Sequence, residues 1–143
     1  TLSSSSAASD VYKRQDYLRA RGDIPETALL VPAPTRASSA RARGGDPVTA
    51  LCESAASRLP GWRTLQALAT SESSADQSEL SAGERADNMR AAVLLRPCAQ
   101  QLRGRAVLLV DDVVTTGATL RASAARIRAV GGDVVGAIVL ADA

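Results

Sequence analysis

One stretch of the chain constrains the fold more than any other. Residues 107–119 read Val-Leu-Leu-Val-Asp-Asp-Val-Val-Thr-Thr-Gly-Ala-Thr. The apolar run at 107–110 is short, β-branched and without alternation, which is typical of a strand buried on both faces of a parallel sheet. Asp111 and Asp112 follow at the carboxyl end of this strand, where open α/β sheets place their ligands. The pattern therefore predicts an α/β fold with a polar site at this edge of the sheet.

The residues that follow predict an anion site. Thr115-Thr116-Gly117-Ala118-Thr119 is a loop of small residues that leads into an Ala- and Arg-rich helix expected over 118–130, and Gly131-Gly132 ends that helix. The first turn of a helix offers unpaired N–H groups and the positive end of its dipole. Gly117 lets the backbone approach a ligand closely, and the threonines add hydroxyl donors.

Together, the two carboxylates suit a polyol and the loop suits a phosphate, so a sugar phosphate fits both. An acid pair alone is also a common end to a parallel strand; the loop and helix start in register with it favour a binding site. A P-loop is excluded because no Gly-Lys-[ST] occurs, and the chain's only lysine is Lys13.

The rest of the chain alternates strands with helices. Asp46-Pro47 is typical of a helix start, with an N-cap followed by proline at the first helical position, and Ser81-Ala-Gly-Glu84 is a capping box. The pattern predicts a mainly parallel twisted sheet of about five strands flanked by helices. The expected strands are 28–31, 64–69, 91–95, 106–110 and 134–140, and the expected helices are 16–21, 46–59, 81–89 and 118–130.

Composition narrows the function classes. The 143 residues suit one domain, and with 2% aromatic residues and no Phe the core must consist of Ala, Val and Leu. A net charge of +2 is too small to indicate nucleic-acid binding. The absence of histidine excludes His-based acid/base chemistry and His metal sites. Cys52 and Cys98 form no C-x-x-C, so we expect reduced thiols of a cytoplasmic protein. No apolar run reaches the ~20 residues of a transmembrane helix.

Residues 1–15 differ from everything after them, with a serine run and the sole lysine. We interpret them as a non-native or disordered tail. The domain is then expected over 16–143, with its natural N-terminal part truncated.

The 107–119 pattern closely resembles the phosphoribosyl-pyrophosphate (PRPP) signature of the type I phosphoribosyltransferases: an apolar strand, two acids, two further residues and T-T-G-x-T. The resemblance implies the fold of that superfamily. It also implies that Asp111 and Asp112 accept hydrogen bonds from the ribose hydroxyls. The 5′-phosphate would lie in the loop formed by Val114, Thr115, Thr116, Gly117, Ala118 and Thr119.

Two further segments extend the likeness. Residues 31–47 contain V-P-x-P…R…R-G-x-D-P, and residues 77–88 contain Q-x-x-L-x-x-x-E-R-x-x-N. Taken alone, the first is also compatible with an ordinary basic loop and the second with a polar surface helix. In this order the three motifs resemble the ComF family in its actinobacterial style, a phosphoribosyltransferase-like branch linked to competence and DNA uptake. By this likeness Pro34, Thr35 and Arg36 belong to a pyrophosphate loop, and Gln77, Arg85 and Asn88 to a flexible loop over about 71–90.

The ComF likeness leaves two functions open. In the first, the chain is an enzyme that binds PRPP with Mg²⁺, held mainly through PRPP, and transfers phosphoribose to an unknown acceptor, with Asp111, Asp112 and Arg85 as catalytic residues. In the second, it is a non-catalytic PRPP sensor or partner-binding protein of the competence machinery. Membrane attachment and direct nucleic-acid binding are not expected, and a homodimer is a further option. One departure is that ComF-like proteins often carry an N-terminal Cys-rich zinc module, which this sequence lacks.

Overall fold

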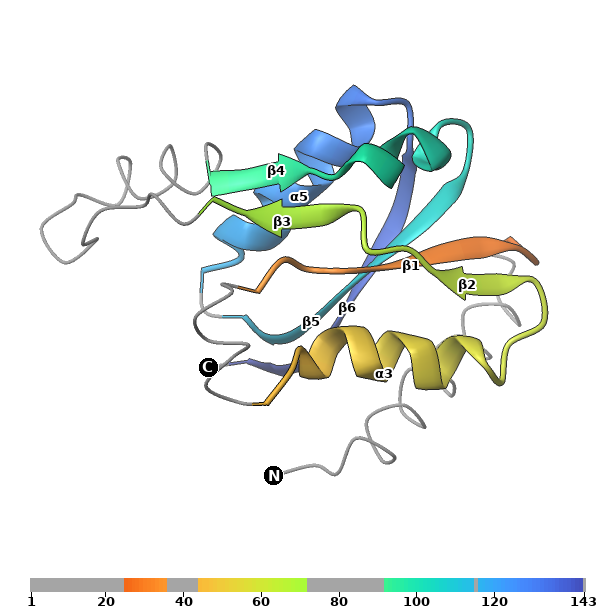
Figure 1. The fold of residues 1–143 in the computed structure, drawn as a ribbon, viewed down its shortest axis with the longest axis horizontal. Helices are drawn as coiled ribbons and strands as arrows, with labels where there is room; N and C mark the ends of the chain where they lie inside the picture. Colours follow the sequence, from red (N-terminus) through yellow and green to blue (C-terminus); the bar gives the residue numbers. More distant parts are fainter. Residues whose placement is uncertain (1–24, 36–43, 72–91, 115, 143) are drawn as a thin grey trace, which may run out of the picture.

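The computed structural model describes residues 25–35, 44–71, 92–114 and 116–142, with the side chains of 113, 114, 141 and 142 excepted (Figure 1). The predicted tail at 1–15 and the predicted helices at 16–21 and 81–89 lie outside these residues. The same holds for most of the predicted flexible loop.

The main sheet has four strands in the described part of the chain. They are β1 (Ala28–Pro32), β2 (Trp62–Thr64), β5 (Ala106–Val114) and β6 (Asp133–Asp142). Their order is β2-β1-β5-β6, and every neighbouring pair is parallel. The prediction of a mainly parallel sheet flanked by helices is confirmed. β1 and residues 107–110 of β5 are buried throughout, as the continuous apolar runs predicted.

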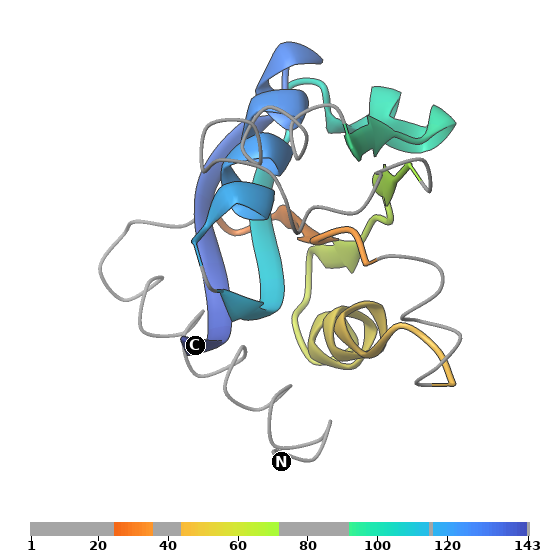
Figure 2. The same cartoon turned by 90° about the vertical axis from the view of Figure 1, so that its left-hand side faces the viewer.

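Two helices cover opposite faces of this sheet. The helix α3 (Pro47–Ala56) connects β1 to β2, and α5 (Ala118–Ala129) connects β5 to β6. Successive strand residues point to opposite faces, so Leu30 and Leu108 pack with α3 in one core cluster. Leu29 and Leu109 pack with α5 in the other cluster. Figure 2 shows the two helices on the two sides of the sheet.

A small hairpin completes the described fold. The antiparallel strands β3 (Leu68–Thr70) and β4 (Val93–Leu95) are followed by the 3₁₀ helix η2 (Pro97–Leu102), which the sequence did not predict. The expectation of one strand over 64–69 is wrong. The chain turns between β2 and β3, where Leu65 N–H donates to Leu30 O at 2.9 Å and Ala67 N–H donates to Leu65 O at 2.9 Å. This turn sends the following residues into a separate sheet.

Candidate functional site

The site lies where the chain leaves the two central strands. β1 and β5 are neighbours, with Pro32 paired to Val110, and Ala33 N–H extends the ladder by donating to Val110 O at 2.7 Å. From β1 the chain runs to α3 on one face, and from β5 it runs to α5 on the other. This divergence makes the carboxyl ends of β1 and β5 a topological switch point, the place where open α/β sheets form their ligand crevice.

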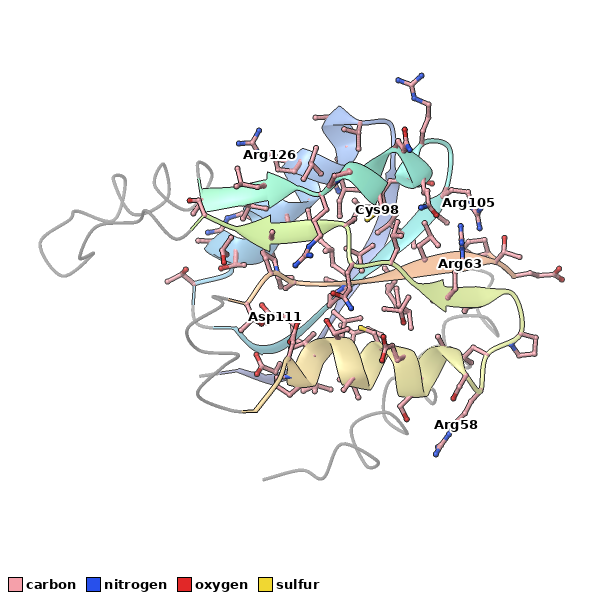
Figure 3. The ribbon with its side chains drawn as sticks, viewed as in Figure 1. Arg58, Arg63, Cys98, Arg105, Asp111 and Arg126 are labelled. Atoms are coloured by element: carbon pink, nitrogen blue, oxygen red, sulfur yellow. The ribbon has the colours of Figure 1, made fainter. Side chains whose placement is uncertain are left out.

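Asp111 and Asp112 lie at this point, and both are half-buried. The backbone N–H of Asp112 donates to Oδ1 of Asp111 at 2.9 Å, which fixes the first carboxylate against the strand end. Burial raises the pKa of Asp111 from its ordinary 3.8 to about 6. The charges of Asp112 and Asp46 add to this rise in the pKa, and the hydrogen bond from the Asp112 backbone opposes it. Asp111 lies at the end of the sheet from which α3 begins (Figure 3).

The loop after β5 has the backbone geometry that a phosphate cradle requires. Gly117 is the N-cap of α5 and adopts the left-handed conformation, with φ +75° and ψ +6°. Because the N-cap residue is a glycine, it has no side chain that could accept a hydrogen bond from the first turn of this helix. Ala118 N–H points back to Thr116 Oγ1 at 3.3 Å, a long contact that a better acceptor can replace. The first turn of α5 is therefore prepared for an anion.

The loop after β1 is held quite differently. Its Thr35 donates from Oγ1 to Asp46 Oδ1 at 3.4 Å, and its carbonyl oxygen accepts from Thr70 Oγ1 at 3.3 Å. Asp46 is the N-cap of α3: Oδ1 also accepts from Val48 N–H at 3.1 Å, and Oδ2 accepts from Thr49 Oγ1 at 2.7 Å. The β1 loop is thus linked to α3 through a side chain and to β3 through its backbone.

The structure places the described members of the predicted site at one edge of the sheet: Pro34, Thr35, Asp111, Asp112, Thr116, Gly117, Ala118 and Thr119. Val114 is the last residue of β5. The remaining predicted site residues, Arg36, Gln77, Arg85, Asn88 and Thr115, lie outside the described residues. In the described ranges no group of three or more His, Cys, Asp or Glu side chains is arranged to hold a metal ion.

Sequence reasoning missed two side chains beside this edge. Asp46 was interpreted as a helix cap and as part of the R-G-x-D-P motif but not as a neighbour of the acid pair, although its charge contributes to the raised pKa of Asp111. Arg96, directly after β4, lines a pocket next to the β1 loop together with Thr35 and Asp46. The Asp46-Pro47 pair predicted the helix cap. Nothing in the sequence around Asp46 or Arg96 predicted that these side chains lie near Asp111 and Asp112.

Comparisons with known proteins agree with this geometry. The family model described as "Phosphoribosyl transferase domain" matches residues 53–143. A solved structure titled "Analysis of an invariant aspartic acid in HPRTs-glutamine mutant" is similar to this chain with a TM-score of 0.55 and 18% identity. The match covers 97% of this chain and 67% of that chain. At this identity the likeness shows the fold alone. The search of curated proteins gives no match. None of the helices in the described ranges is long and apolar enough to cross a membrane.

Proposed function

Because the chain belongs to the phosphoribosyl transferase domain family, we propose that it binds PRPP at the carboxyl edge of β1 and β5. In this proposal it transfers the phosphoribosyl group to an acceptor and releases pyrophosphate. One observation carries the proposal: a half-buried acid pair lies in the last part of the central strand β5, and a helix start with a left-handed glycine and no capping carboxylate among the described residues follows the same strand. This arrangement offers acceptors for ribose hydroxyls beside donors for a phosphate.

The acids account for the ribose. Asp111 and Asp112 offer carboxylate oxygens that accept hydrogen bonds from the two vicinal hydroxyls. Transfer passes through a ribose with oxocarbenium character, so carboxylates beside the ring also stabilise the positive charge that develops there. The half-buried position of both acids strengthens that interaction, because charges interact more strongly away from bulk water.

The loop after β5 accounts for the 5′-phosphate. The backbone N–H groups of the first turn of α5 and the hydroxyls of Thr116 and Thr119 are suited to a phosphate dianion, and Gly117 keeps Cβ atoms away from it. Val114, Thr115 and Ala118 complete the proposed segment. Of the remaining proposed residues, Arg36 would join Pro34 and Thr35 in the pyrophosphate loop, and Arg85 would act on the leaving group with Gln77 and Asn88 in the same lid.

The chemistry needs positioning and charge stabilisation more than a protein acid or base. Mg²⁺ would neutralise the diphosphate, held mainly by substrate oxygens and water, as this ion prefers. The oxygen-rich donor set of Asp111 and Asp112 fits that ion. The residues of this chain orient the sugar. Through the proposed lid they also exclude water from the oxocarbenium-like ribose.

The finer assignment is to the ComF type, supported by the order of the three sequence motifs. We place the protein in competence and DNA uptake on that basis, in the cytoplasm, with an acceptor still to be identified. Its alternative, a PRPP sensor without turnover, uses the same binding site. Pyrophosphate release with a panel of bases and amines separates the two: steady release identifies an enzyme, and binding without release identifies a sensor.

Titration calorimetry of the full chain with PRPP and Mg²⁺ tests the binding site. We expect binding in the wild type and its loss in the Asp111→Asn/Asp112→Asn double variant. Asp133→Asn is the matched control, because this exposed acid is the first residue of β6 and lies at the amino ends of the strands, away from the proposed site at their carboxyl ends. Failure of the wild type to bind, or equal binding by the double variant, would refute the proposed function.

A further inference from the structure

A small pocket lies beside the acids, on the β1 side of the switch point. It has a volume of about 90 Å³ and is bounded by the β1 loop, the first turn of α3, β3 and Arg96. A single water needs roughly 10–15 Å³ of such space, so the pocket holds several waters or one phosphate-sized group. Its wall includes Pro32, which pairs with Val110, and Ala33, whose N–H donates to Val110 O at 2.7 Å, and Val110 directly precedes Asp111. The pocket is therefore a neighbour of the acid pair.

The side chain of Arg96 lies against the first residue of β3, Leu68, and lines this pocket. Its backbone N–H donates to Ala67 O at 2.8 Å, so the backbone of residue 67 faces β4. Successive residues of a strand direct their backbone groups to opposite edges, and the carbonyl of Leu68 consequently faces away from β4. Nε of Arg96 donates to this carbonyl at 3.1 Å. The bond anchors the guanidinium on the pocket side of the hairpin.

The anchored guanidinium keeps most of its donors. A guanidinium carries five N–H groups, and one on Nε leaves four on the two Nη atoms. These Nη atoms make no hydrogen bond or ion pair to any residue that the structure describes. Because Nε already fixes the plane, binding an anion through the Nη atoms orders less of the side chain than it would for a free arginine.

The other polar groups of the pocket allow an anion. The hydrogen bonds of Thr35 Oγ1 and Thr70 Oγ1 measure 3.4 and 3.3 Å, longer than the usual ~2.5–3.0 Å between oxygens, so both hydroxyls can turn to a ligand. The acid in the wall, Asp46, is engaged by Val48 N–H and by Thr49 Oγ1 at 2.7 Å. The positive end of the α3 dipole also offsets its charge.

The placement identifies which anion. PRPP carries one phosphate on C5 and a diphosphate on C1, at opposite sides of the ribose. With the 5′-phosphate at α5 and the hydroxyls at Asp111 and Asp112, the diphosphate extends toward β1. We infer that Arg96 binds the diphosphate of PRPP through the one phosphate group that fits this pocket, with the hydroxyls of Thr35 and Thr70, and holds pyrophosphate after transfer. This inference rests on the proposed function and adds a binding residue outside every motif of the sequence.

Three ligands separate this role from the rest of the site. Calorimetry measures the affinity of PRPP, ribose 5-phosphate and pyrophosphate, each with Mg²⁺, for the full chain and for Arg96→Gln. A charge-assisted hydrogen bond contributes about 1.5–3 kcal/mol, so PRPP and pyrophosphate should bind roughly tenfold to a hundredfold more weakly. Ribose 5-phosphate, which lacks the diphosphate, should bind as in the wild type. Arg58→Gln is the control, an exposed arginine past the far end of α3 (Figure 3).

Each outcome decides one question. Equal PRPP affinity in wild type and Arg96→Gln overturns this inference and leaves the proposed function intact. An equal loss for PRPP and ribose 5-phosphate also overturns it, because the arginine then acts on the whole site. Should the wild type bind no PRPP, the proposed function fails. Pyrophosphate alone then decides the inference: binding that Arg96→Gln weakens supports the anion pocket, and binding that the variant leaves unchanged, or no binding, overturns it.

Discussion

Two strand–loop–helix units meet at the centre of this molecule, and they differ in how their helices begin. The α3 helix starts with proline at its first position and is capped by its own Asp46. The α5 helix starts after a left-handed glycine, which offers no capping side chain of its own, and the described contact to its first turn is the 3.3 Å one from Ala118 N–H to Thr116 Oγ1. Both helices follow neighbouring parallel strands and point their N-termini to the same edge of the sheet.

The difference separates a helix N-terminus that the chain itself caps from one that is suited to bind a ligand. An anion at a helix N-terminus satisfies free N–H groups and the dipole wherever that anion comes from. In α3 the anion is a carboxylate of the chain itself, so this end is complete without a ligand. In α5 no carboxylate of the described residues takes this position, and the neutral hydroxyl of Thr116 makes only a 3.3 Å contact there, so the proposed 5′-phosphate of PRPP would fill it. Stability should therefore depend on the first helix start and affinity on the second.

The largest expected effect comes from closing the α5 cradle. Gly117→Val should lower PRPP affinity by at least a hundredfold, because a branched side chain intrudes on the proposed phosphate position and opposes the N-cap φ of +75°. Some stability is lost as well, since a left-handed backbone costs about 1–2 kcal/mol for other residues. Calorimetry and thermal unfolding on the same variant measure both effects.

Gly104→Val is the matched control for that experiment. Gly104 has a similar φ of +68°, and a Cβ there would meet nothing within 4 Å. It should lose stability to a comparable extent and keep its affinity for PRPP. Preserved PRPP affinity in Gly117→Val would mean that Gly117 is only a helix-entry glycine, and the distinction between the two helix starts would fail.

At the other helix start, Asp46→Ala should lower the stability of the fold. Losing an N-cap costs about 0.5–2 kcal/mol, and the linked Thr35 and Thr49 also lose an acceptor. Asp46→Asn keeps the cap and should stay near the wild type in thermal unfolding. Cys52 reports on α3 directly: burial raises the pKa of its thiol to about 12, so alkylation should be slow in the wild type and faster in Asp46→Ala. Equal alkylation rates in Asp46→Ala and Asp46→Asn would show that the cap does not hold this helix.

The sequence predicted the parts of this site that are local. Residues 107–119 hold a strand, its two acids and a glycine-led helix start in one continuous motif, and the parallel sheet follows from the buried run. The Asp46 cap was equally local, because Asp-Pro before an apolar helix face has few other interpretations. Its nearness to Asp111 was not predictable, since that depends on how β1 and β5 pair across most of the chain.

The errors have the same physical origin. Leu65-Gln66-Ala67 contains none of the glycine, proline or asparagine residues that usually mark a turn, so β2 and β3 were interpreted as one strand. The bond that turns the chain runs to Leu30, which is far away in sequence. Arg96 likewise has its anchor on Leu68, a contact that only the antiparallel pairing of β3 and β4 creates.

The smallest expected effect concerns the acids between the two helix starts. Because the pKa of Asp111 rises from 3.8 to about 6 on folding, the folded state binds more protons than the unfolded state between these values. Stability should then fall as the pH rises from about 4 to 6 and stay level above 7. Asp111→Asn removes the charge, so it should unfold at a higher temperature than the wild type at pH 7.5 and at the same temperature at pH 4.

We expect that gain to be about 1 kcal/mol, reduced from the full linkage value because Asp111 is only half-buried and water screens its charge. The same variant should lose PRPP affinity, so stability and binding move in opposite directions at one residue. Asp133→Asn, at the amino ends of the strands, should change neither the melting temperature nor the affinity for PRPP. A melting temperature for Asp111→Asn below that of the wild type at pH 7.5 would mean that the charged carboxylate of Asp111 stabilises the fold. Asp111 would then resemble Asp46, whose carboxylate serves the structure without a ligand, and not the start of α5, which is proposed to bind one.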